Sequence, residues 1–193
     1  SGMPLFEEGQ ALTSPFNSQY NEGGPTLTAD NKLMVFTICE RNPKTGKQNC
    51  DLYYTTFGYG VWNGIRPMTN VNEPDSWESQ PSISPNGDVL YFASDRKSGE
   101  GGLDIYRSVK TITGDWSTPV NLGPTINTSK NEKSPFIHPD SESLYFASNG
   151  HPGMGGYDLF KSRSDELAWD KPQNLGYPIN TEKDEIGLMV TLD

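Results

Sequence analysis

The chain has 193 residues, of which 25 are acidic and 15 basic, so its formal net charge is −10 at pH 7. This charge argues against DNA, RNA or an anionic membrane surface as the main partner, because all three are polyanions. A hydrophobic fraction of 33% and no apolar run near the roughly 20 residues of a spanning helix argue against insertion into a membrane. The 20 glycines, 15 prolines and 11% aromatic residues favour an all-β protein of short strands.

The chain begins with the end of a repeat, which is followed by three complete copies and the start of another. Within the first segment, Pro15-Phe-Asn-Ser matches Thr125-Ile-Asn-Thr at the end of a later copy. The segments span about residues 4–21, 22–77, 78–131, 132–184 and 185–193. We expect them to form one module covering residues 1–193.

Three kinds of landmark residue recur at a period of 53 to 56 residues. They are Glu22, Glu78, Glu132 and Glu185; Asp51, Asp104 and Asp158; and Trp62, Trp116 and Trp169. Each full copy reads as four short strands, including an alternating run such as Val89–Ala93. Four strands per copy of this length are typical of a β-propeller blade. The sequence therefore predicts an all-β propeller module with three full four-stranded blades and partial blades at both ends.

The segments at residues 134–140, 151–160 and 174–181 resemble the TolB-type, WD-repeat-like propeller repeat. They are most similar to the propeller of periplasmic OmpA-associated lipoproteins, a family that includes the PorE component of type IX secretion. The resemblance implies a periplasmic location, tied to the outer membrane or cell wall through other parts of a parent protein. It also implies a non-catalytic scaffold that binds protein partners of a cell-envelope complex.

The repeated acids allow a functional and a structural interpretation. The aspartates could be metal ligands or catalytic groups, but one per blade spreads them apart, so we expect each to close its own loop. The glutamates could ring an axial channel and hold a cation, or they could bind the backbone of a neighbouring turn. We favour the structural interpretation for both sets and predict no metal site, no catalytic residue and no cofactor.

The loops at residues 40–49, 95–102 and 149–156 differ most between the copies, and we expect them to contact partners on one face. The candidate partner-binding residues are Arg41, Lys44, Arg96, Lys97, Glu100, His151 and Met154, with Trp77 from another loop. Trp77 breaks the repeat pattern and is either a packing residue or a contact residue. The three repeated tryptophans are predicted to pack as wedges between blades.

The two cysteines, Cys39 and Cys50, stand at the two ends of the first of these loops. A disulfide between them is sterically plausible, and two reduced buried thiols are the alternative. The disulfide agrees with the export that the family resemblance implies.

Neither a recurring pair of carboxylates nor a Ser/His/Asp set stands outside the repeat pattern, so we expect the protein not to be an enzyme. Two alternatives are a glycan- or cation-binding propeller, supported by Tyr59, Trp62 and Trp77, and a propeller attached to a glycosidase or peptidase. The terminal strands expected at Phe6–Leu12 and Leu188–Leu192 would have open edges. We therefore expect a homodimer that pairs through these edges.

Overall fold

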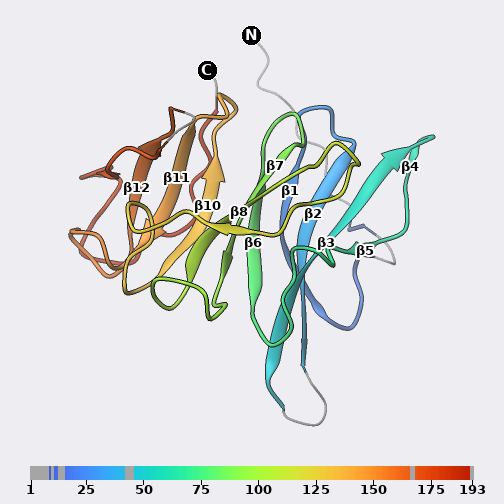
Figure 1. Cartoon of the computed structure of the whole chain (residues 1–193), viewed down its shortest axis with the longest axis horizontal. Coiled ribbons are helices and arrows are strands. Elements are labelled where there is room, and N and C mark those ends of the chain that lie inside the picture. The colour runs from blue at the N-terminus through green and yellow to red at the C-terminus, as the bar shows by residue number, and fades with distance from the viewer. Residues whose placement is uncertain (1–8, 10, 13–15, 42–45, 166–167, 192–193) are drawn as a thin grey trace.

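A computed structural model describes residues 9, 11–12, 16–41, 46–165 and 168–191 of the chain. In these ranges the secondary structure consists of thirteen β-strands and no helix (Figure 1). None of the described segments is therefore a helix that could cross a membrane. The all-β class predicted from the turn-rich composition is confirmed.

The strands form three antiparallel sheets that follow one another along the chain. The first sheet contains β1 (Asn21–Leu27), β2 (Leu33–Arg41) and β3 (Gln48–Gly58), with the short strands β4 (Val61–Trp62) and β5 (Arg66–Pro67) both paired to β3. The second contains β6 (Glu78–Ile83), β7 (Val89–Ser94), β8 (Asp104–Val109) and β9 (Val120–Asn121). The third contains β10 (Glu132–Ile137), β11 (Ser143–Ser148), β12 (Asp158–Arg163) and β13 (Gln173–Asn174).

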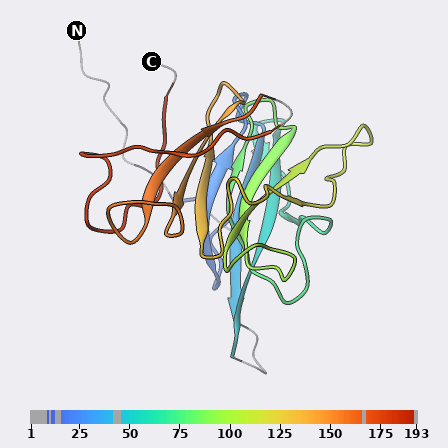
Figure 2. The ribbon, with the colours of Figure 1, turned by 60° about the vertical axis from the view of Figure 1, so that its left-hand side comes forward.

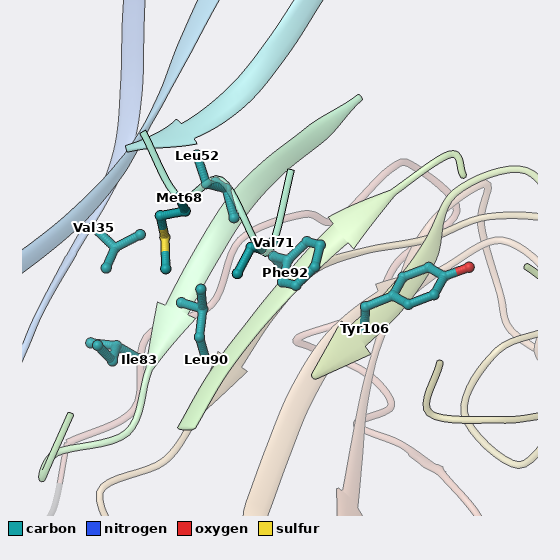
Figure 3. Close-up of a cluster of buried hydrophobic side chains, with 8 residues drawn as sticks. All are labelled: Val35, Leu52, Met68, Val71, Ile83, Leu90, Phe92 and Tyr106. Atoms are coloured by element: carbon teal, nitrogen blue, oxygen red, sulfur yellow. The ribbon is translucent and has the colours of Figure 1, made fainter. Parts of the chain in front are cut away.

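The sheets stack side by side through alternating side chains of their middle strands. In β7, Leu90 and Phe92 enter the core between the first and second sheets, whereas Tyr91 enters the core between the second and third. Figure 3 shows the first of these cores, in which residues from both sheets meet. Because successive side chains of a strand point to opposite faces, one strand supplies both cores.

The first strand of each sheet lies at the inner side of the stack. Strands β1, β6 and β10 are neighbours, and Figures 1 and 2 show them side by side. Each has a register shift just after its glutamate, with a positive φ of 57° at Gly24, 55° at Gln80 and 51° at Ser134. A proline follows in every case. In the part of the chain that is described, the three sheets form an arc that does not close.

The predicted terminal strands are not found. Residues 185–191 form no strand, although Gly187 repeats the positive φ of the inner strands, with a value of 75°. The prediction of a strand at Leu188–Leu192 is therefore wrong as far as Thr191, although residues 187–191 lie across a groove from β10. At the other end, Gly9, Ala11 and Leu12 belong to no strand, and the rest of Phe6–Leu12 lies outside the described residues.

Candidate functional site

The repeated glutamates bind the turns that precede them. Glu132 accepts hydrogen bonds from the backbone N–H and the hydroxyl of Thr128, at 2.7 and 2.9 Å, and Glu185 is bound in the same way by Thr181. Glu78 and Glu132 are completely buried. Each carboxylate thus ties the start of its own repeat to the end of the previous repeat, as the structural interpretation predicts.

A repeated asparagine that the sequence analysis did not single out performs a related task. In each sheet its side-chain amide accepts from the N–H and donates to the C=O of one third-strand residue, over 2.8–3.0 Å. The pairs are Asn72 with Leu52, Asn127 with Ile105 and Asn180 with Leu159. Each amide thus makes the same pair of hydrogen bonds to a strand residue that the backbone of a neighbouring strand would make. The signal was present in the sequence as an asparagine that recurs every 53 to 55 residues.

The aspartates that begin the third strands close their own loops in the second and third sheets. Asp104 accepts from the backbone N–H of Glu100, and Asp158 accepts from those of Met154 and Gly155, at 2.9 and 3.1 Å. The carboxylate of Asp51, in the first sheet, accepts from the Asn49 side chain at 3.3 Å. Burial, followed by the charges of two nearby glutamates, raises the pKa of Asp51 above its ordinary value.

The glycine pairs in these loops allow close backbone packing onto the next repeat. A Cβ added at Gly101 would overlap the carbonyl oxygens of Thr128 and Lys130, and one at Gly155 would overlap that of Lys183. The backbone N–H of Gly102 donates to the Lys130 carbonyl at 2.6 Å. The glycine pairs of the predicted recognition loops in the second and third sheets are therefore used to join consecutive repeats.

Arg96, predicted to contact a partner, is instead a buried structural residue. One guanidinium nitrogen, Nη2, lies 3.0 Å from Glu78 Oε1 and donates to the Val71 carbonyl at 2.9 Å. The guanidinium also lies over the rings of Phe92 and Tyr106, at 5.3 and 4.7 Å from their centres. The prediction for Arg96 is wrong, because these groups bury its charge inside the molecule.

His151 occupies the corresponding place in the third sheet. Its Nε2 lies 2.8 Å from the carbonyl oxygen of Ile126, and its ring packs against Phe146 and Phe160, at 5.9 and 5.3 Å between ring centres. Ile126, Phe146 and Phe160 are the repeat equivalents of the residues around Arg96. This histidine is partly buried and is tied to the core, so it is a poor candidate for contact with a partner.

The remaining loop candidates that the structure describes are exposed. Arg41 is exposed and donates from Nε to the Gly46 carbonyl at 2.9 Å, whereas Lys44 lies outside the described residues. The other exposed candidates are Lys97, Glu100, Met154 and Trp77.

The landmark tryptophans are half-buried and pack near the junctions of the sheets. Trp116 packs against the core between the first and second sheets, and Trp169 against the next core. Trp62 contacts the rings of Phe57 and Phe16, at 5.2 and 6.3 Å.

Cys39 and Cys50 are joined by a disulfide, and they stand opposite each other in the register of β2 and β3. The bond closes the hairpin that carries the first loop. The loop of the first sheet is thus held by a covalent bond, whereas Arg96 holds the equivalent loop of the second sheet and His151 that of the third.

A groove of about 850 Å³ runs along the inner strands. Pro25, Pro81 and Pro135 line it, and residues 187–191 form its far side. Across the described parts of the chain, no three side chains of the His, Cys, Asp or Glu type gather in a way that could hold a metal ion.

No protein-family model matches the chain, and no curated protein matches its sequence. Among solved structures, a putative TolB from Agrobacterium tumefaciens is 14% identical, with a TM-score of 0.47 over 80% of this chain and 62% of that one. The AtxE2 isopeptidase is 10% identical, with a TM-score of 0.47 over 78% and 28%. A puromycin hydrolase is 11% identical, with a TM-score of 0.43 over 82% and 30%. The chain thus spans less than two thirds of each of these proteins.

These similarities correct the expectation that the protein is not an enzyme. An isopeptidase and a hydrolase are among the similar structures, each matched over less than a third of its length. The exclusion of enzymes is therefore withdrawn.

Proposed function

We propose that the chain is a protein-interaction and assembly module of a cell-envelope protein, built as an arc of four-stranded propeller blades. Three consecutive antiparallel sheets with the same glutamate and asparagine ties support the blade architecture. The Cys39–Cys50 disulfide supports a periplasmic location, because such bonds persist in oxidising compartments. The resemblance to OmpA-associated lipoproteins favours a complex at the outer membrane or peptidoglycan, such as the type IX secretion machinery.

The observation that carries this proposal is the uncovered end face of the third sheet. Ile126, at the end of the second repeat, is 0% exposed because the third sheet covers it, whereas its equivalent Ile179 is 46% exposed. Tyr177 and Met189 are also exposed at this end of the chain. Apolar surface of this kind is typical of a site that binds another protein.

The partner that fits this face is a second copy of the chain, bound through the same face. The opposite end offers Leu27, which is 43% exposed, but a head-to-tail copy would have to place its β1 where residues 185–191 already lie beside β10. A dimer in which both copies use the same end face avoids this overlap and closes on itself. The predicted homodimer is thus retained, with packed end faces in place of paired terminal strands.

Light scattering and sedimentation over a range of protein concentrations test this proposal. We expect a reversible dimer whose Kd rises about tenfold in Ile179→Ser, because loss of that apolar burial weakens the contact by about 1.4 kcal/mol. Ile112→Ser is the matched control, since Ile112 is fully exposed on a turn of the second sheet. A monomer at all concentrations, or an equal loss in Leu27→Ser, would contradict the proposal.

A further inference from the structure

An open cleft of about 440 Å³ lies between the first and second sheets, away from the end faces. Its walls include Trp116 from the second sheet and Tyr54 and Phe57 from the first. Its size is within the range of about 300–1,000 Å³ that is usual for small-molecule sites. The cleft is independent of the surface on which the proposed function rests.

A comparison with the next junction explains why this cleft is open. Between the second and third sheets, the ring of Tyr91 lies edge-on to Trp169, with 6.1 Å between ring centres. The equivalent of Tyr91 in the first sheet is Val35, whose side chain is much smaller and is buried in the core. One face of Trp116 therefore lacks the ring that covers Trp169.

The cleft has polar groups that the protein itself does not use. Neither the hydroxyl of Tyr54 nor the indole N–H of Trp116 has a hydrogen-bond partner among the described residues. Four charged side chains also line the cleft, and their charges cancel; they are Asp30, Lys32, Lys110 and Asp115. In a protein of net charge −10, this cleft is locally neutral.

The walls are held in place by their own hydrogen bonds. The side-chain amide of Asn70, which follows β5, donates to the Trp116 carbonyl at 3.3 Å and so joins the two sheets across the cleft. The backbone N–H of Thr111 donates to the Asp115 carbonyl at 2.7 Å and closes the turn that carries Trp116. A ligand would therefore meet a largely preformed site, which lowers the entropic cost of binding.

We propose that this cleft binds a neutral oligosaccharide. A sugar ring presents apolar C–H groups that can pack on Trp116, Tyr54 and Phe57, and hydroxyls that can donate to Asp115 and accept from Lys110 or the Tyr54 hydroxyl. A phosphorylated ligand would gain little from this site, because the two lysine charges are balanced by two carboxylates and the whole protein is acidic.

Calorimetric titration of the full chain with chitotriose, cellotriose and maltotriose tests the proposal, with ATP as the anionic comparison. We expect one or more of the trisaccharides to bind with a Kd near 1 mM or below, and ATP to bind more weakly. Tyr54→Phe should raise that Kd about threefold, and Trp116→Phe about tenfold.

Two matched controls separate the cleft from the rest of the surface. Trp77→Phe and Lys97→Ala alter exposed residues elsewhere and should leave the Kd unchanged within about twofold. Circular dichroism identifies any variant that fails to fold, and Tyr54→Phe removes only one oxygen. The absence of trisaccharide binding at about 10 mM, tighter binding of ATP, or an equal effect of Trp77→Phe and Trp116→Phe would overturn the proposal.

Discussion

The second and third sheets fasten the same loop with different chemistry. In the second sheet the guanidinium of Arg96 reaches the Val71 carbonyl, and in the third sheet the imidazole of His151 reaches the Ile126 carbonyl. Both side chains pack on the equivalent pair of rings, but only Arg96 also compensates a buried carboxylate, that of Glu78. The two side chains stand one position apart in the repeat, since Arg96 aligns with Gly150 and His151 with Lys97. Different residues of a variable loop can therefore perform one structural task, and variability alone does not identify a binding loop.

The first sheet shows a third solution, in which the Cys39–Cys50 disulfide closes the loop covalently. Its hairpin strands are also the longest of the described strands, with nine residues in β2 and eleven in β3. The three sheets thus share an architecture and differ in what holds the loop: an ion pair, an imidazole–carbonyl contact or a covalent bond. Each solution predicts a different response to mutation or to solution conditions.

Arg96→Ala should give the largest effect. It removes the charged partner of Glu78, whose carboxylate would stay buried, and we expect the free energy of unfolding to fall by about 3–5 kcal/mol. Urea denaturation measures this change. His151→Ala should cost only about 1 kcal/mol, because the contact it removes involves no paired buried charge. Equal losses would show that the two sheets are fastened in the same way.

Trp116→Ala should give the next largest effect, a fall of about 3 kcal/mol in the free energy of unfolding. This value is at the lower end of the range for the loss of a large aromatic side chain, because the open cleft leaves Trp116 half-buried. Trp77→Ala should cost less than about 1 kcal/mol, since this side chain is exposed in a loop. Thermal unfolding of both variants makes the comparison. Equal shifts in Tm would contradict the distinction between a junction tryptophan and a loop tryptophan.

Reduction of the Cys39–Cys50 disulfide should lower the free energy of unfolding by up to about 3 kcal/mol, as the chain-entropy model gives for a loop of this length. The measurement is urea denaturation with and without dithiothreitol, together with thiol counting on unreduced protein. The double variant Cys39→Ser, Cys50→Ser should be insensitive to the reductant. Two free thiols in the unreduced protein would contradict the prediction that a covalent bond distinguishes the first sheet from the other two.

The smallest effect concerns the turn between the first two strands, where the third sheet has Asp140 and the second has Asn86. Burial alone would raise the pKa of Asp140, but backbone N–H groups of Ser143 and Glu142 and the nearby His138 lower it from the ordinary 3.8 to about 2. Because the pKa is lowered by folding, the ionised group stabilises the protein above about pH 4 and loses this contribution as the pH falls towards 2.

Asp140→Asn removes this titration and makes the turn resemble that of the second sheet. We therefore expect the difference in Tm between wild type and Asp140→Asn to shrink between about pH 4 and pH 2 and to vanish below. Calorimetry across this range is the measurement. A constant difference would show that the carboxylate charge does not matter to the turn.

The sequence predicted the repeat and the middle strands well because both depend on local pattern. The alternating run at Val89–Ala93 lies within the observed strand Val89–Ser94, and the landmark residue Asp104 begins the observed strand Asp104–Val109. The short fourth strands were harder, since β9 and β13 contain only two residues each and are defined by their partners. Residues 187–191 have the pattern of a first strand and lie across a groove from β10, but they form no strand.

The sequence by itself determined the order of the middle strands and the spacing of the sheets, because these follow from residues that recur at a fixed period. The groups that the recurring glutamates and asparagines bind became clear only in the structure. Only the tertiary structure decided which side chains are buried. Arg96 reads as an exposed loop residue until a carboxylate, a carbonyl and two rings from separate segments converge on it. Likewise, whether Trp116 is covered depends on the residue that the preceding sheet presents to it. Burial is set by contacts between distant segments, and a local sequence pattern does not contain them.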